Sequence, residues 1–352
     1  MKKLLYISLA LLLVMGLFVI GCGETEVDEP VDEEVVDEEP AEEVVDEPAG
    51  DPIVWEAACG WPRGNVHREQ AELYAEMLAE ATNGELTLNI VGPETIPGPD
   101  QIEVLSTGAL DLVITVTAYY LQDLPEASFV HYVMGSREDR AAAGVYEFLD
   151  EIHRERYNAT HLTESPAGYM HVYTTEPIES IEDFAGKRFR SPPAYMAGLE
   201  EMGATTMFMG DADTIDALNS GVLEGLITAH VTYDQWNYVE VAPYTIYPPM
   251  AFNATHMFCN VDSVENLPAH LRDALYDTME EAEPLMDDLA LEMLEEIEAQ
   301  ADEKGFQEVH FEGEEADEYY AIWFEAYMEN VVRPESGDEV ADRLWEIYNE
   351  LI

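Results

Sequence analysis

IESIEDFAGKRFRSP at residues 178–192 and LEEMGATTMFMGDADTIDALNSGVLEGLI at residues 199–227 form the stretch that indicates the fold most directly. The segment KRFR places three basic side chains in four positions, in a chain that has few of them. If these residues form a strand, Arg188 and Arg190 share one face and Phe189 lies on the other, because side chains alternate along a strand. An arginine at the end of a strand can hold a carboxylate through two charge-assisted hydrogen bonds, or it can simply neutralise neighbouring acids.

Alternating strands and helices surround this stretch and predict an α/β fold with a parallel or mixed sheet. Apolar and β-branched runs indicate the strands, and apolar residues at helical spacing indicate the helices. The expected strands cover residues 53–58, 86–91, 110–116, 170–173, 188–190 and 225–229. The expected helices cover residues 68–82, 99–107, 194–202, 214–219, 268–301, 315–331 and 337–351. Pro284 is expected to kink or split the longest helix.

The same stretch resembles the solute-binding proteins of tripartite ATP-independent periplasmic (TRAP) transporters, of the DctP type. In that family a segment ending in GlKiR precedes a segment ending in vvDG, and this chain keeps that order. Two upstream segments, EMLAEATNGELTLNIV and EVLSTGALDLVI, also resemble family motifs. The matching positions are Asp183, Gly186, Arg190, Gly203, Ala204, Ala217, Leu218, Gly221, Gly225, Asn260, Asn266, Leu267 and Pro268.

The resemblance implies a two-lobed periplasmic-binding-protein (Venus-flytrap) architecture with a long helix that spans the lobes. Lobe I would comprise residues 52–167 and about 256–295, and lobe II would comprise residues 168–255 and about 296–352. Such a protein closes around an organic acid and delivers it to the small and large membrane subunits of the transporter. It catalyses no reaction, and we expect no cofactor or nucleic acid to take part. No metal-ligating residues stand out, and a metal ion that assists the carboxylate stays an open alternative.

In the family that the chain resembles, the arginine that ends GlKiR forms a salt bridge with the carboxylate of the solute, and Arg190 holds this position. Weaker correspondences imply solute contacts after the first strand, at the end of the third strand and after the vvDG motif. Trp236 is a further aromatic residue that would suit a solute with an apolar body. The candidate ligand-binding residues are therefore Arg190, Trp61, Thr115, Thr117, Tyr119, Thr228 and Trp236.

Two departures from the family pattern narrow the expected solute. Some members, such as sialic-acid binders, carry a second arginine where this chain has Met170. Those members also read QENP after the vvDG motif, where this chain has LITA at residues 226–229. The departures argue against sialic acid and against a typical dicarboxylate, and they favour a monocarboxylate with an apolar or aromatic body.

Residues 1–22, MKKLLYISLALLLVMGLFVIGC, are typical of an export signal, since two lysines precede an apolar run. The final VIGC resembles the lipobox of bacterial lipoproteins, in which the cysteine, here Cys22, is lipidated and becomes the first residue of the mature protein. The alternative is an uncleaved membrane anchor. Residues 23–51 are rich in Glu and Asp and predict a disordered acidic tether. Either interpretation predicts an extracytoplasmic protein attached to the cell membrane, in the periplasm or on the outer face.

The chain has 352 residues, with 75 acidic and 15 basic side chains and a formal net charge of −60. This excess of acid argues against a nucleic-acid or anionic-membrane binder, because phosphate contacts need clustered Lys and Arg. The hydrophobic content of 47% is nevertheless sufficient for a folded core. At molar salt the Debye length is about 3 Å, so the charge predicts a halophilic source and a melting temperature that rises with NaCl concentration.

Common enzyme and metal-site motifs, such as GxSxG, HExxH and the P-loop, do not occur in the sequence. The nine histidines are scattered and are expected to be packing or surface residues. Cys59 and Cys259 either form a disulfide or are two buried thiols. Three other functions stay open: the binding lipoprotein of an ATP-driven (ABC) importer, a secreted two-domain enzyme, and an acidic scaffold lipoprotein.

Overall fold

A mixed sheet of ten strands organises the part of the chain that the computed structural model describes, residues 52–299 and 304–351. The strand order is β2-β1-β3-β9-β4-β7-β5-β6, and β8 pairs with β4 and with β10. The strands are β1 (Ile53–Cys59), β2 (Leu86–Val91), β3 (Leu112–Thr115), β4 (Ala159–Thr174), β5 (Arg188–Arg190), β6 (Thr205–Met207), β7 (Gly225–Ala229), β8 (Tyr244–Tyr247), β9 (Ala251–Asn260) and β10 (Gln307–His310). The export signal and the tether predicted from residues 1–51 lie outside these ranges.

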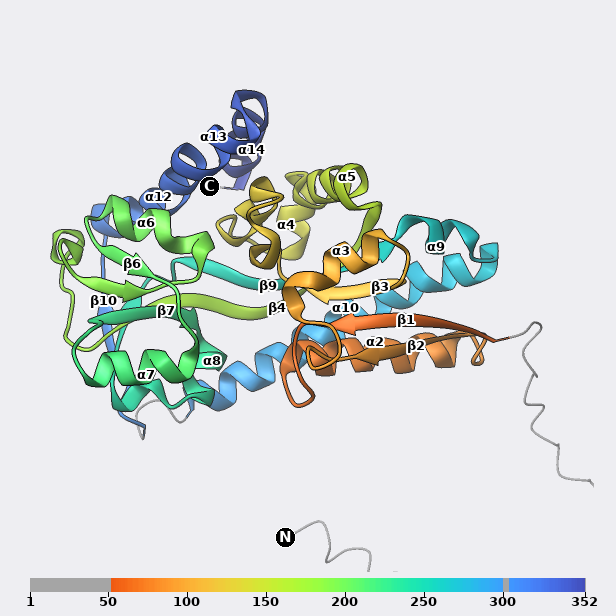
Figure 1. Cartoon of the computed structure of the whole chain (residues 1–352), viewed down its shortest axis with the longest axis horizontal. Coiled ribbons are helices and arrows are strands. Elements are labelled where there is room, and N and C mark those ends of the chain that lie inside the picture. The colour runs from red at the N-terminus through yellow and green to blue at the C-terminus, as the bar shows by residue number, and fades with distance from the viewer. Residues whose placement is uncertain (1–51, 300–303, 352) are drawn as a thin grey trace, which may run out of the picture. The chain divides into compact units, whose positions relative to one another are not determined.

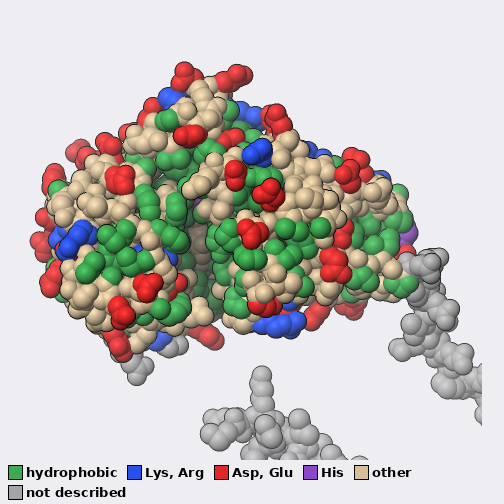
Figure 2. Space-filling view, in the orientation of Figure 1, with side chains coloured by type: hydrophobic (Ala, Val, Ile, Leu, Met, Phe, Trp, Pro, Cys, Tyr) green, Lys and Arg blue, Asp and Glu red, His purple; other side chains and the backbone are tan. Residues whose placement is uncertain are grey.

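The two long strands β4 and β9 join a region that contains β1, β2 and β3 to a region that contains β5, β6 and β7 (Figure 1). The first part of β4 is antiparallel to β9, beginning where Ala159 pairs with Asn260, whereas the last part pairs with β7 and β8. Between Pro166 and Tyr169 the register shifts, and Gly168 has φ +79°. Figure 2 shows that the surface is hollowed between these two regions.

Helices cover both faces of the sheet. They are α2 (Val66–Ala81), α3 (Gln101–Ser106), α4 (Arg137–Ala142), α5 (Val145–Tyr157), α6 (Met196–Glu201), α7 (Asp211–Asn219), α8 (His230–Gln235), α9 (Val261–Asn266), α10 (Ala269–Glu298), α12 (Glu314–Tyr327), α13 (Arg333–Ser336) and α14 (Asp338–Leu351). Helix α10 passes through Pro284 without ending, so the split that the proline suggested does not occur. No helix within the described ranges has the length and apolar character needed to cross a bilayer.

Helix α10 packs against both regions of the sheet. In the first region, Gln70 Nε2 of α2 donates to the carbonyl of Met286 at 2.8 Å. At the register shift of β4, a Cβ on Gly168 would lie 2.9 Å from Leu294 of α10. The glycine therefore meets two requirements there, a left-handed backbone and a close approach of the helix.

Some of the helices and strands expected from the sequence lie where they were predicted, and others differ. Strands β2, β5 and β7 lie at the expected residues, and α2 begins two residues earlier than expected. The expected strand at 170–173 is only the end of β4, and the expected strand at 110–116 is shortened to β3. The sequence did not predict strands β6, β8, β9 and β10 or helices α4, α5, α8, α9 and α13.

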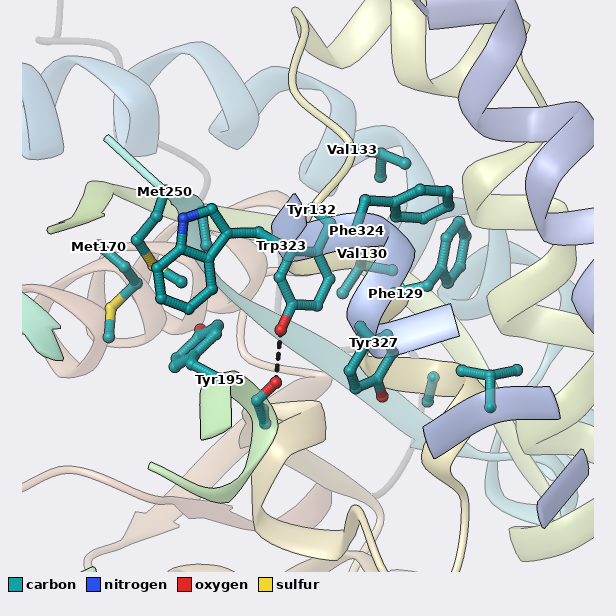
Figure 3. Close-up of a cluster of buried hydrophobic side chains, with 14 of the residues drawn as sticks. Phe129, Val130, Tyr132, Val133, Met170, Tyr195, Met250, Trp323, Phe324 and Tyr327 are labelled. Carbon is teal, nitrogen blue, oxygen red and sulfur yellow. Dashed lines mark hydrogen bonds between the residues drawn. The ribbon is translucent and has the colours of Figure 1, made fainter. Parts of the chain in front are cut away.

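The largest hydrophobic cluster lies under α12 and includes Trp323, Phe324 and Tyr327 together with Phe129 and Tyr132 (Figure 3). Helix α12 comes so close to α6 that a Cβ on Gly198 would lie 2.2 Å from the ring of Trp323. A second cluster fills the space between β1, β3, α2 and α10, and a third lies between β4, β7 and α8. Each region of the sheet therefore has its own core on at least one face.

Cys59 and Cys259 are buried in the second cluster as free thiols. The disulfide that the sequence left open is therefore not formed. Burial raises the pKa of the Cys59 thiol to about 11, because the thiolate loses its hydration. The two residues act as small apolar side chains in this core.

Six of the nine histidines are buried: His67, His131, His153, His171, His230 and His256. Burial lowers the pKa to about 3 for His67 and to about 4 for His131, His153 and His171, because the imidazolium would lose its hydration. In the unfolded chain the ordinary value of 6.5 applies. Below that pH the unfolded chain binds protons that the folded chain does not bind, so the free energy of unfolding falls with falling pH.

We expect the free energy of unfolding to decrease between pH 6.5 and pH 4, the interval between the ordinary and the lowered pKa values. Each buried histidine contributes a slope that approaches about 1.4 kcal/mol per pH unit. Urea unfolding in molar NaCl at several pH values measures the slope. His256→Gln should remove about one such contribution, and His270→Gln, at an exposed position, is the control. A slope that His256→Gln left unchanged would contradict this account.

Candidate ligand-binding site

Arg190 ends strand β5, with its side chain on the face that α7 and α8 cover. Phe189 points to the opposite face and packs in the core against Phe184, as the alternation of a strand requires. Arg188 lies on the same face as Arg190 at the other end of the strand, where it pairs with Glu224. The expected orientation of all three KRFR strand residues is therefore confirmed.

The guanidinium of Arg190 is held by backbone carbonyls. Nε donates to the carbonyl of Met209 at 3.2 Å, and Nη1 donates to the carbonyl of Ile227 at 2.9 Å. The ring of Phe208 lies over the group, with its centroid 5.5 Å from the central carbon. The guanidinium has five N–H donors, so both donors of Nη2 and one donor of Nη1 make no hydrogen bond within the described part of the chain. Arg190 is only 7% exposed, and it is the last residue of β5. Its guanidinium is therefore a positive charge held in place at the carboxyl edge of the sheet.

Asp211, the first residue of α7, is the acid nearest to this cation. Its Oδ1 lies 3.7 Å from Arg190 Nη2 and accepts a hydrogen bond from the hydroxyl of Tyr238 at 2.9 Å. Burial and the neighbouring carboxylate of Asp211 raise the pKa of Tyr238, so the phenol stays protonated and donates. Asp211 could not be identified from the sequence, since one acid among 75 gives no signal of its own.

Thr228 lies on β7 next to Ile227, whose carbonyl accepts the hydrogen bond from Arg190. Its partner on β4 is His171, so both side chains occupy the face that Arg190 occupies. Met170, at the position where some relatives carry a second arginine, is buried in the largest hydrophobic cluster on the opposite face. The described residues around Arg190 therefore include no second arginine from β4.

Trp61 and Tyr119 meet in the other region of the sheet, after the carboxyl ends of β1 and β3. Their rings are stacked, with centroids 5.9 Å apart and an interplanar angle of 25°. Tyr119 also packs on the backbone at Gly60, where a Cβ would lie 3.2 Å from its ring. The two residues form an aromatic surface at the carboxyl edge of this region, and Tyr119 is 37% exposed.

Thr115 and Thr117 are fully buried at the end of β3. Thr117 Oγ1 lies 3.0 Å from His131 Nε2 and accepts from the hydroxyl of Ser128 at 3.1 Å. Nδ1 of His131 donates to the carbonyl of Phe252, so the unprotonated Nε2 accepts from Thr117. Thr115 Oγ1 is buried and has no hydrogen-bond partner within the described residues.

Trp236 lies apart from the other candidates. It caps the C-terminus of α8 and is 41% exposed. Within the described residues its ring stacks on no other aromatic side chain. The structure thus brings Arg190 and Thr228 together in one region and Trp61 and Tyr119 together in the other, and it joins Trp236 to neither group.

Two cavities lie away from Arg190. One of about 650 Å³ is lined by Tyr132, Met134, Met250, Asp317, Tyr320, Ala321, Glu325, Trp345, Tyr348, Asn349 and Leu351. Another of about 340 Å³ is lined by Tyr169, His171, His230, Tyr247, Pro249, Leu291, Leu294 and Glu295. No cluster of three or more metal-ligating side chains occurs among residues 52–299 and 304–351. The chemistry of the candidate site is therefore that of Arg190 and its neighbours.

Comparison with known proteins adds a family match. Residues 58–332 match the model of the bacterial extracellular solute-binding protein family 7. A solute-binding protein of Chromohalobacter salexigens is 24% identical over 206 residues, which are 53% of this chain and 60% of that protein. The ectoine-binding periplasmic protein TeaA of Halomonas elongata is 28% identical over 225 residues, which are 58% of this chain and 64% of that protein. The alignments thus span less than two thirds of these curated relatives.

Solved structures share the fold over almost their whole length. DctP7 of Bordetella pertussis, an extracytoplasmic solute receptor that binds pyroglutamic acid, has a TM-score of 0.70 at 18% identity, covering 84% of this chain and 99% of that one. A TRAP periplasmic solute-binding protein of Rhodobacter sphaeroides, solved in an open form without ligand, has a TM-score of 0.75 at 18% identity, covering 85% and 99%. The two-lobed α/β fold expected from the sequence is confirmed.

Proposed function

Because the chain belongs to the bacterial extracellular solute-binding protein family 7, we propose that it is the solute-binding subunit of a TRAP transporter. It binds a small organic acid by its carboxylate, closes its lobes around the acid and presents it to the membrane subunits. The family match favours this function over the binding lipoprotein of an ABC importer and over a secreted enzyme. Several neighbouring structures contain organic acids, among them pyroglutamate and orotate.

The observation that carries the proposal is the guanidinium of Arg190. Two backbone carbonyls fix the side chain at the carboxyl edge of β5, and both donors of Nη2 are left for a ligand. Ligands of open α/β sheets bind beyond the carboxyl ends of the strands, which is where this group lies. A carboxylate at this edge would accept charge-assisted hydrogen bonds from it.

Lobe closure in this proposal divides the chain as the sequence suggested, into residues 52–167 with about 256–295 and residues 168–255 with about 296–352. The register shift of β4 at Gly168 lies at the first of these boundaries and gives the strand a place to bend. Trp61 and Tyr119 would approach the solute from lobe I, and Arg190 and Thr228 would hold it from lobe II. A solute that touches both lobes stabilises the closed state over the open one.

Attachment to the cell membrane completes the proposal. Cys22 would carry the lipid, and residues 23–51 would act as the tether that lets the lobes reach the membrane subunits. Metabolic labelling with a fatty acid, and its loss in Cys22→Ser, would test the anchor separately from solute binding.

Thermal unfolding in molar NaCl with L-pyroglutamate, L-lactate, L-proline, L-alanine and orotate tests the solute-binding function. A bound solute at 100 times its Kd stabilises the fold by about 2.7 kcal/mol, which raises the melting temperature by several degrees. Small-angle scattering should show compaction with the same solute, and mass spectrometry should recover it unchanged. Chemical conversion of the solute, or stabilisation without compaction, would contradict the proposal.

A further inference from the structure

The acid beside Arg190 changes which solutes the site can accept. Asp211 Oδ1 lies 3.7 Å from Arg190 Nη2, the nitrogen that is left for the carboxylate of a solute. The hydroxyl of Tyr238 fixes Oδ1 at 2.9 Å, and the first turn of α7 fixes its backbone. The positive and the negative group are therefore held side by side, and neither is free to move away.

Each group of this pair keeps unused hydrogen-bonding capacity. Arg190 has both donors of Nη2 without a hydrogen bond in the described part of the chain, and Asp211 has its second carboxylate oxygen, Oδ2, in the same condition. The side chain of Asp211 is 26% exposed, so part of this residue faces solvent beside the largely buried guanidinium. The positively charged donor Arg190 and the negatively charged acceptor Asp211 thus lie next to each other at the carboxyl edge of the sheet.

A simple anion meets opposing forces at this edge. Its carboxylate is attracted to Arg190 but repelled by Asp211, whose charge is only a few ångströms further away. The net charge of −60 adds a repulsive field in dilute salt. A solute that carries a cationic N–H group beside its carboxylate satisfies Asp211 as well as Arg190, and a solute with no net charge is not repelled by the protein.

We infer that Arg190 and Asp211 form a zwitterion pair, so that the site selects a solute with a carboxylate and an adjacent ammonium or amidinium group over a simple monocarboxylate. The inference rests on the proposed function, since it assigns the class of organic acid that the same site binds. Arg190 takes the carboxylate through Nη1 and Nη2. Asp211 takes the cationic N–H group through Oδ2, and Tyr238 holds Asp211 in place.

Two matched pairs of solutes separate the two classes. L-proline and L-pyroglutamate share a five-membered ring, and L-alanine and L-lactate share a three-carbon chain, but only the first member of each pair has a cationic amine. We expect calorimetry in molar NaCl to show that the zwitterion of the fitting size binds at least ~10-fold more tightly than its anionic counterpart, the range expected for one charge-assisted hydrogen bond.

Asp211→Asn is the decisive variant, because asparagine keeps the shape and can still accept from Tyr238. It should weaken the zwitterion by ~10-fold or more and leave the anion equal or tighter. Asp213→Asn removes the same charge from the exposed side of the same helix turn and should change neither affinity.

Tighter binding of the anion to the wild-type protein, or an equal effect of Asp211→Asn on both members of a pair, would overturn the inference. Its failure is distinct from failure of the proposed function. If only the zwitterion selectivity is wrong, Arg190→Gln still abolishes binding of whichever carboxylate binds. If the function is wrong, Arg190→Gln changes nothing.

Discussion

Replacement of Arg190 by glutamine is expected to weaken carboxylate binding by ~100-fold or more while the chain stays folded. Hydrogen bonds to a charged group contribute about 1.5–3 kcal/mol each, and loss of two of them corresponds to at least two powers of ten in Kd. Calorimetry with the solute that stabilises the wild-type protein best measures the change. Arg190→Lys should also fail, since an ammonium cannot satisfy the carbonyls of Met209 and Ile227 and still offer two parallel donors to the solute.

The matched control for this variant is Arg188→Gln. Arg188 lies on the same strand and the same face, but its guanidinium pairs with Glu224 at the other end of the strand. Its side chain is 43% exposed, so the substitution should cost little stability and leave the affinity unchanged. An Arg190→Gln protein that retained affinity within ~3-fold of the wild type would remove the basis of the proposed function.

Local sequence pattern was sufficient for the strand that carries the site. The alternation in KRFR fixed which face Arg190 occupies, and a following glycine-closed helix and apolar run located α7 and β7. The pattern is sufficient here because the core holds Phe189 on one face of the sheet only. The neighbouring residue on β7, Gly225, must lack a side chain where the ring of Phe189 lies. A Cβ on Gly225 would lie 2.4 Å from the ring of Phe189.

Pairing partners far apart in the sequence could not be inferred in the same way. Strand β9 and the first part of β4 contain His161, Glu164 and His256, residues that rarely signal a buried strand. Their positions depend on tertiary hydrogen bonds, such as the 3.2 Å contact between the rings of His161 and His256. Asp211 is a similar case, since its relation to Arg190 exists only once α7 has packed beside β5.

A second large effect, on the free energy of unfolding, is expected at a buried ion pair between α4 and β4. Arg140 of α4 is fully buried and pairs with Glu164 of β4. It also donates to the carbonyls of Val130 and Val133, and the hydroxyl of Tyr146 donates to Glu164 at 3.2 Å. Protein groups accept hydrogen bonds from Nη1 and Nη2 of Arg140, whereas its buried Nε makes no hydrogen bond within the described residues.

Arg140→Met is expected to lower the free energy of unfolding by about 3–5 kcal/mol, because it leaves the carboxylate of Glu164 buried without its cation. Urea unfolding in molar NaCl at neutral pH measures the loss. Arg343→Met is the control, since Arg343 pairs with Glu151 at the surface, where the two side chains are 43% and 61% exposed. That substitution should cost at most about 1 kcal/mol.

The double variant Arg140→Met with Glu164→Leu decides what the pair contributes. If the cost of the single variant arises from an uncompensated charge, removal of both charges should recover most of the stability, because an apolar pair of similar volume requires no desolvation of ions. A double variant as unstable as Arg140→Met would instead assign the cost to the carbonyls of Val130 and Val133. Val130 and Val133 flank His131 and Tyr132 in the sequence, and the hydroxyl of Tyr132 donates to the carbonyl of Ala194 in the segment that follows β5 (Figure 3). Loss of solute affinity together with stability in that case would show that Arg140 fixes the contact between the two regions, and not only the charge of Glu164.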